Sequence, residues 1–218
     1  MELKEINSLV ELFFKKYEEK SSEQNQLFLK WLKNEKKISF TWKQVQNNIV
    51  ILSHYLRKIL SNGDRCVLLS ENRPEWLITD IAIMLANGIT VPAYTTYTEK
   101  DYKYLIEDCE PSIIIVSNSI LHDKLKNIID EKSFIKKVIT FDKIENIRDE
   151  NKYLNFSSII KRQLKEVDKI ENLNLKRNSP ACIIYTSGTG GNPKGVILSH
   201  GGILNNCDGA LDILKPLL

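Results

Sequence analysis

The stretch ACIIYTSGTGGNPKGVIL, residues 181–198, decides the fold of this 218-residue chain. Its two ends are runs of apolar and β-branched residues, which predict two strands. Its middle, residues 185–195, holds four glycines, several hydroxyl side chains and one lysine. Glycines let the backbone turn and present its N–H groups, while hydroxyls add donors and the lysine adds a positive charge. The stretch therefore predicts a loop that joins two strands and lies over a polyphosphate group.

Two common phosphate-binding patterns do not fit this loop. A Walker A loop needs Gly-Lys followed by Ser or Thr and then a helix, whereas Lys194 is followed by Gly195 and a predicted strand. Gly188 and Gly190 supply the first half of a dinucleotide fingerprint, but Pro193 stands where its third glycine is required. The alternative is an exposed hairpin turn with no ligand. Because a turn needs only one or two glycines, the array of donors favours an anion-binding loop.

Upstream of the loop, strand-like and helix-like patterns alternate. The expected strands are 66–69, 90–93, 112–117 and 137–141, and the expected helices are 74–87, 98–108, 121–130 and 157–170, with a solvated loop over 142–152. This alternation predicts the α/β fold class, with βαβ units and a largely parallel sheet. The run Ile113–Val116 lacks polar alternation, which is typical of a strand covered on both faces.

The N-terminal sixty residues predict a different arrangement. Apolar residues recur at helical spacing over 3–20, two short strands are expected at 27–32 and 37–41, and Thr41 is expected to cap a helix that runs to about Leu60. The apolar face of 3–20 is expected to dock on the domain. The alternative, a peripheral membrane contact, is disfavoured because the segment carries several glutamates that an anionic membrane surface would repel.

Composition excludes several classes of protein. The 31 basic and 28 acidic residues are interspersed and leave a net charge of +3, so nothing points to nucleic acid as a partner. No apolar run approaches membrane-spanning length, and the N-terminus lacks the basic flank and apolar core of a signal peptide. We therefore expect a cytoplasmic protein, with membrane association left as the alternative.

Cysteine and histidine spacing predicts no metal site. No pair among the four cysteines has C-x-x-C spacing, so we expect reduced and buried thiols. The three histidines have no ligand spacing either. His54 and His122 fall on expected helices without a nearby partner and are interpreted as structural or solvated. His200 lies at an expected helix start, where packing and a position near the active site remain open.

The loop resembles the phosphate-binding signature of the adenylate-forming, or AMP-binding, enzymes, which include acyl-CoA synthetases, firefly luciferase and peptide-synthetase adenylation domains. Residues 185–195 match that signature except at Gly190, where a threonine is usual. Two further stretches, 63–76 and 88–98, are similar to the long-chain fatty acyl-CoA synthetase branch. The resemblance runs from about Phe40 to the C-terminus and is weakest over 132–177.

The resemblance implies a long-chain fatty acid–CoA ligase. In such enzymes ATP with Mg²⁺ activates a fatty acid to an acyl adenylate, and CoA then displaces AMP to give a thioester. The implied partners are fatty acid, ATP and CoA. The implied catalytic residue is Lys194, and the implied phosphate-binding residues are Thr186, Ser187, Gly188, Thr189, Gly190, Gly191 and Lys194. For Lys194 the alternative is an ordinary solvated surface lysine.

Family members are much longer than this chain. We therefore expect residues 1–218 to be the N-terminal portion of the AMP-binding domain, with the rest of the large domain and the C-terminal domain absent. The groups that bind Mg²⁺ and ribose would then lie elsewhere, and we expect this chain alone to be inactive. The alternatives are another acyl- or aryl-CoA ligase, an adenylation domain, or a non-catalytic nucleotide-binding fragment.

Overall fold

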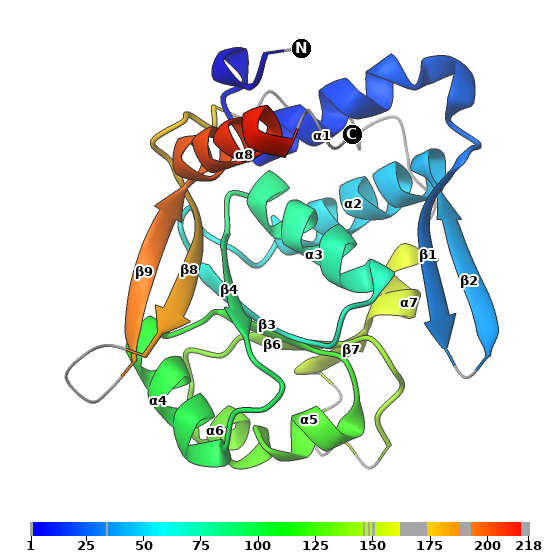
Figure 1. Cartoon of the computed structure of the whole chain (residues 1–218). Helices are drawn as coiled ribbons and strands as arrows, with labels where there is room; N and C mark the ends of the chain where they lie inside the picture. The colour runs from blue at the N-terminus through cyan, green and yellow to red at the C-terminus, as the bar shows by residue number, and fades with distance from the viewer. Residues whose placement is uncertain are drawn as a thin grey trace.

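The computed structural model describes residues 2–33, 35–145, 147, 149, 151–161, 174–187 and 193–214 (Figure 1). Within them, seven strands form one sheet: β3 (Arg65–Leu69), β4 (Ile89–Ala93), β5 (Ile113–Val116), β6 (Lys137–Thr140), β7 (Tyr153–Asn155), β8 (Pro180–Thr186) and β9 (Lys194–Ser199). Their order across the sheet is β7-β6-β5-β3-β4-β8-β9. Every neighbouring pair is parallel except β8 with β9. The predicted α/β class and largely parallel sheet are confirmed.

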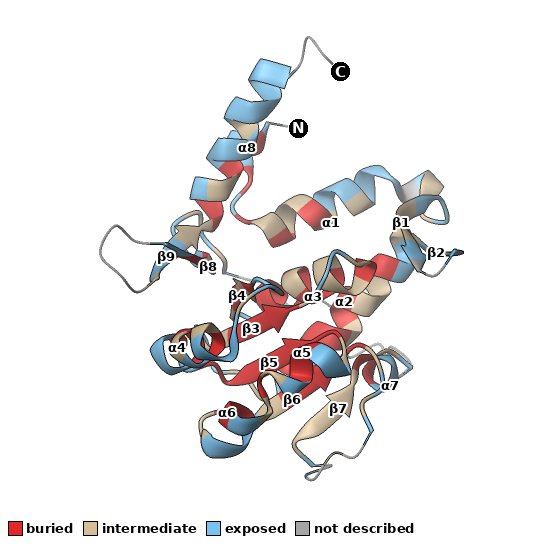
Figure 2. Ribbon diagram, turned by 60° about the horizontal axis from the view of Figure 1, so that its bottom comes forward, coloured by how far each residue is buried: buried red, intermediate tan, exposed pale blue. Residues whose placement is uncertain are grey.

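Helices cover both faces of this sheet. One face carries α2 (Trp42–Leu56), α3 (Pro74–Leu85) and α7 (Phe156–Ile160), and the other carries α4 (Glu99–Cys109), α5 (Ser119–Asp123) and α6 (Lys126–Glu131). Strand β3 serves both cores, because Cys66 and Leu68 join the first cluster while Val67 and Leu69 join the second. Figure 2 shows the resulting layer of buried central strands between the helices.

The segment expected as one helix over 3–20 is two elements, so that prediction is wrong. A short 3-10 helix, η1 (Leu3–Glu5), is followed by α1 (Leu9–Glu19). The break comes at Ser8, whose side chain caps α1 by accepting the Glu11 N–H at 3.0 Å. The apolar side chains still dock on the domain, since Ile6 and Val10 are buried.

The next two expectations, a pair of short strands and a helix capped by Thr41, are confirmed. The second 3-10 helix, η2 (Ser21–Glu23), leads into the antiparallel hairpin of β1 (Leu27–Lys33) and β2 (Lys36–Thr41). Thr41 then caps α2 through a capping box with Gln44. The last helix, α8 (His200–Leu214), begins directly after β9.

Two further expectations need correction. The helix expected over 121–130 is the pair α5 and α6, because the chain turns between them at Lys124 and Leu125. The helix expected over 157–170 is α7, which ends at Ile160, and residues 162–170 lie outside the described residues. Strand β7 was not anticipated, since three half-buried residues give too short a pattern to recognise.

Candidate functional site

The glycine-rich loop joins two antiparallel strands, as predicted. In the register of β8 and β9, Thr186 lies opposite Lys194 and Tyr185 lies opposite Gly195. Thr186, Ser187 and Lys194 are exposed at the base of the loop. The remaining residues assigned to phosphate binding, Gly188, Thr189, Gly190 and Gly191, lie outside the described residues. The structure therefore places two hydroxyls and one ammonium group together where the loop leaves the sheet.

The loop emerges at the carboxyl edge of the parallel sheet. Strand β8 runs parallel to β4, so its carboxyl end points the same way as those of β3 and β4. The strand order reverses at β3, because β4 lies on one side of it and β5 on the other. In open α/β sheets ligands bind outside the carboxyl ends of the strands at such a switch point. Topology and loop chemistry thus point to the same edge.

A cavity of about 380 Å³ lies at this edge. It is lined by residues 70–72 after β3, 92–95 at the end of β4, 184–185 of β8, and Trp76 of α3. Among these residues the charged side chain is Glu71, whose Oε1 accepts the Asn118 Nδ2–H at 2.5 Å. The cavity combines one carboxylate with aromatic and aliphatic walls, next to the hairpin that carries Lys194.

Two of the cavity's aromatic residues were interpreted from sequence only as core or surface side chains. Trp76 and Tyr94 both line the cavity, and Tyr94 is 61% exposed. The loop around Tyr94 is held in place, because the Tyr102 hydroxyl donates to the Tyr94 carbonyl at 2.7 Å. Lys124 Nζ also donates to the Thr95 and Tyr97 carbonyls, at 3.3 and 3.2 Å. Trp76 and Tyr94 follow the carboxyl ends of β3 and β4 in the sequence, and this position was the signal that could have assigned them to the site.

Tyr185 anchors the hairpin to the sheet. Its side chain is buried, and its hydroxyl donates to Asp108 of α4. Burial raises the pKa of Tyr185, so the phenol stays protonated and acts as a donor. Opposite it, Gly195 leaves no room for a side chain. A Cβ there would lie 2.9 Å from Ile183 Cγ2 and 3.2 Å from Tyr185 Cζ.

The histidines and cysteines considered in the sequence differ in burial and in their hydrogen-bond partners. His122 was expected to lack a partner, and that is wrong, since its Nε2 lies 2.8 Å from the Tyr153 hydroxyl. His200 is fully buried, and its Nδ1 accepts the Leu9 N–H at 3.3 Å. Cys66 and Cys109 are buried as expected, whereas Cys182 is half-buried and Cys207 is exposed.

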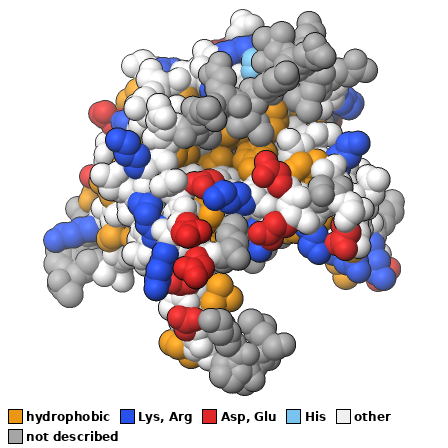
Figure 3. All heavy atoms as spheres, turned by 90° about the horizontal axis from the view of Figure 1, so that it is seen from above, with side chains coloured by type: hydrophobic (Ala, Val, Ile, Leu, Met, Phe, Trp, Pro, Cys, Tyr) orange, Lys and Arg blue, Asp and Glu red, His pale blue; other side chains and the backbone are white. Residues whose placement is uncertain are grey.

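The described residues contain neither a metal-binding cluster nor a membrane-spanning helix. No group of three or more His, Cys, Asp or Glu side chains there could hold a metal ion. No helix there is long and apolar enough to cross a membrane. On the described part of the face that carries α1 and α8, acidic and basic side chains are interspersed (Figure 3).

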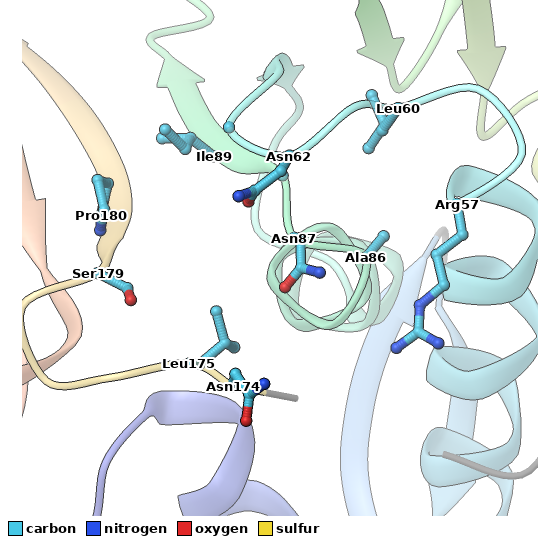
Figure 4. A pocket seen from close by; sticks show the side chains of 12 residues that line it. Arg57, Leu60, Asn62, Ala86, Asn87, Ile89, Asn174, Leu175, Ser179 and Pro180 are labelled. Atoms are coloured by element: carbon cyan, nitrogen blue, oxygen red, sulfur yellow. The ribbon is translucent and has the colours of Figure 1, made fainter. Parts of the chain in front are cut away.

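A larger cavity, of about 580 Å³, lies at the opposite edge of the sheet (Figure 4). Its walls come from the turn after α2, the end of α3 and the chain before β8, and include Arg57, Asn62, Asn87 and Ser179. The Arg57 guanidinium is turned toward α3, where Nε and Nη2 donate to the Leu85 carbonyl at 3.3 and 2.9 Å. Because this cavity is at the amino ends of β3, β4 and β8, it is separate from the loop.

The match to a family model decides what kind of chain this is. The model described as AMP-binding enzyme matches residues 18–215, nearly the whole sequence. The chain belongs to the AMP-binding enzyme family. Its fold agrees with this membership. It superposes on the anthranilate CoA ligase AuaEII, in complex with anthranoyl-AMP, with a TM-score of 0.75 and 20% identity, over 92% of this chain and 36% of that one.

Curated members of the AMP-binding enzyme family include relatives of this chain. It is 32% identical over 153 residues to the long-chain-fatty-acid–CoA ligase ACSBG2 of Gallus gallus, covering 67% of this chain and 20% of the relative. It is 28% identical over 182 residues to long chain acyl-CoA synthetase 3 of Arabidopsis thaliana, covering 81% and 27%. The chain thus spans about a fifth to a quarter of the length of these relatives.

Proposed function

We propose that this chain is the N-terminal part of the large domain of an ATP-dependent long-chain fatty acid–CoA ligase. The observation that carries the proposal is the β8–β9 hairpin, whose signature loop leaves the carboxyl edge of a parallel sheet between Thr186 and Lys194. The names of the relatives support long-chain acyl groups as substrates. An acyl- or aryl-CoA ligase of another specificity is the alternative within the family.

In this proposal the hairpin binds the β- and γ-phosphates of ATP. Thr186 and Ser187 donate their hydroxyls, Lys194 adds a point charge, and the backbone N–H groups of residues 188–191 complete the cradle. These groups fit an anion, because each is a donor or a cation. With glycine at 190 in place of the usual threonine, the side-chain hydroxyl is lost and the backbone N–H remains.

In the proposed reaction, these residues would stabilise negative charge. When a carboxylate attacks the α-phosphorus, negative charge builds up on the phosphorus centre and on the departing pyrophosphate. A lysine and several preorganised N–H groups stabilise that charge without reorganising solvent. Mg²⁺ would neutralise the same phosphates. In this proposal the Mg²⁺ ligands lie in other parts of the protein, as the resemblance to the AMP-binding enzymes implies.

The binding step can be tested on this chain. MgATP titrated into the ¹⁵N-labelled protein should shift the amide signals of residues 185–195 selectively. Lys194→Ala should weaken the affinity about tenfold or more, because it removes one charge-assisted contact. Lys58→Ala is the control, since Lys58 is an exposed lysine of the turn after α2, at the opposite edge of the sheet. Unmoved hairpin signals at saturating MgATP would contradict the proposal.

The catalytic step needs the longer parent protein. There, Lys194→Ala should lower kcat/KM for ATP in the adenylation step by roughly 10²-fold, as for the loss of one preorganised charge donor. ATP–pyrophosphate exchange with a long-chain fatty acid measures this step. An unchanged kcat/KM would show that Lys194 is an ordinary surface lysine.

A further inference from the structure

The N-terminal segment, residues 3–9, lies beside the start of α8 (Figures 1 and 2). Arg177 joins the two elements. Its Nη1 donates to the Leu3 carbonyl at 3.0 Å and also to the Ile6 carbonyl, while its Nη2 donates to Asn205 Oδ1 of α8 at 2.6 Å. Leu3 and Ile6 form a buried cluster with Leu204 of α8. One guanidinium and a small apolar core thus fix the segment to α8.

His200 makes a second link between the same elements. Its Nδ1 accepts the N–H of Leu9, the first residue of α1, at 3.3 Å. That N–H has no partner within its own helix. Because Nδ1 is an acceptor, the neutral ring carries its proton on Nε2, which is buried and without a hydrogen-bond partner among the described residues. Among the described residues, the hydrogen bond that this buried imidazole makes is therefore with the N-terminal segment.

Arg177 precedes β8 and His200 follows β9, so both residues lie at the base of the β8–β9 hairpin. The His200 N–H donates to the Ser179 carbonyl at 3.1 Å, and the Gly201 N–H donates to the Arg177 carbonyl at 2.7 Å. The contact is close, since a Cβ at Gly201 would lie 2.9 Å from both the Cβ and the carbonyl oxygen of Arg177. The base of the hairpin is thus closed where the N-terminal segment is attached.

The backbone pairing that joins this hairpin to the rest of the sheet is short. Strand β8 pairs with β4 at one register position, Thr90 with Cys182, whereas β3 pairs with β4 at five positions. Strand β9 is the outermost strand. The direction in which the hairpin leaves the sheet therefore depends on contacts at its base as well as on strand pairing.

We propose that residues 3–9, Arg177 and His200 form a clasp that positions the β8–β9 hairpin, and with it the loop that faces phosphate. Arg177 and His200 are positioning residues, because they act through the hairpin and touch no reacting atom. The positioning of the loop rests on the function proposed above, whereas the clasp itself does not. Opening the clasp should loosen the hairpin first and lower phosphate affinity as a consequence.

Amide hydrogen exchange on this chain tests the clasp directly. In His200→Phe, protection of the hairpin amides of Ile183 to Tyr185 and Val196 to Leu198 should fall about tenfold, because one hydrogen bond is lost. In Arg177→Ala it should fall at least as far, because several hydrogen bonds are lost. The amides of β3 and β5 should keep their protection. Lys152→Ala is the control, because Lys152 Nζ also donates to a backbone carbonyl, that of Ile129 at 2.6 Å, but beside β7, at the opposite side of the sheet from the hairpin.

Conservative variants separate positioning from general stability. His200→Asn places an amide oxygen where Nδ1 stood and should restore most of the protection that His200→Phe loses. Arg177→Lys keeps the charge but not the fork and should restore little. Unchanged hairpin protection in Arg177→Ala and His200→Phe, or an equal loss across β3 and β5, would overturn the clasp.

Binding of inorganic tripolyphosphate tests the link to the loop. Its affinity should fall threefold to tenfold in His200→Phe and recover in His200→Asn, in step with hairpin protection. Equal affinity for wild type and His200→Phe, with protection lost, would refute the positioning role. A wild-type chain that binds no tripolyphosphate would count against the proposed function, and hydrogen exchange would still decide the clasp.

Discussion

Gly195 shows how one residue limits what the hairpin can accept. A Cβ at this position meets the Tyr185 ring, which its hydrogen bond to Asp108 holds in place. Gly195→Ala should therefore destabilise the protein by about 1–3 kcal/mol, as overpacking does. Gly209→Ala is the control, since a Cβ there meets nothing within 4 Å and should stabilise α8 by about 0.5–1 kcal/mol. Urea unfolding measures both, and equal stability of the two variants would contradict the steric argument.

Two groups, the buried His200 and the half-buried Asp80 of α3, should give the protein opposing responses to pH. Burial lowers the pKa of His200 to about 4 and raises the pKa of Asp80 to about 6. The unfolded state binds more protons than the native state at His200, so that group makes stability rise with pH between about 4 and 6.5. At Asp80 the native state binds more, so that group makes stability fall as pH rises from about 4 to 6.

Single substitutions should separate these two responses. Asp80→Asn leaves the histidine's response, so the variant's own stability should rise with pH, by about 3 kcal/mol between about pH 4 and 6.5. His200→Asn should change in the opposite sense. Urea unfolding at several pH values between 4 and 7 gives both curves. The charged side chains that bind the same segment, Arg177 and Glu11, are present in both variants. Parallel curves would show that these groups titrate normally.

At the scale of elements, helix caps explain which boundaries could be predicted. Thr98 caps α4 by accepting the Asp101 N–H at 3.3 Å, and Asp101 in turn accepts the Thr98 N–H at 2.9 Å. Thr98→Ala should therefore cost about 1 kcal/mol of stability. Thr98→Ser keeps the hydroxyl and serves as the control in the same thermal unfolding measurement. A Thr98→Ala midpoint equal to that of Thr98→Ser would mean that the cap contributes nothing.

Boundaries were missed where apolar spacing continued through a break. Leu3 and Ile6 are in phase with the apolar positions of α1, but they are buried against α8 and belong to a separate element. Periodicity reports which side chains are buried and cannot tell one helix from two. Ser8 was the local signal of this break, since it is a good N-cap residue in the middle of an apolar pattern.

The site was predictable only in the part that is contiguous in sequence. The hairpin loop carries its donors within eleven residues, so composition alone identified it. The neighbouring cavity is assembled from residues 70–72, 92–95 and 184–185, which the sheet brings together. Nothing local in those segments signals a shared wall. The expected parallel sheet with its switch point was the one sequence-level observation that could have located it.

At the scale of the whole molecule, we expect the chain alone to lack adenylation activity. The described residues offer phosphate donors but no acidic group cluster for Mg²⁺, and the chain spans about a fifth to a quarter of its curated relatives. Fatty-acid-dependent exchange of labelled pyrophosphate into ATP should stay at background with the purified chain. The longer parent protein, assayed in parallel, is the control. Exchange above background by the chain alone would refute this expectation.

Trp76 gives the cavity at the carboxyl edge an optical reporter. The other two tryptophans are engaged elsewhere, since Trp42 stacks on Phe28 and Trp31 lies under the Arg73 guanidinium. In a chain whose Trp31 and Trp42 are replaced by phenylalanine, tryptophan fluorescence would come from the cavity wall alone. Occupancy of that cavity could then be followed without a label, and its emission would separate ligands that enter the cavity from those that bind the hairpin.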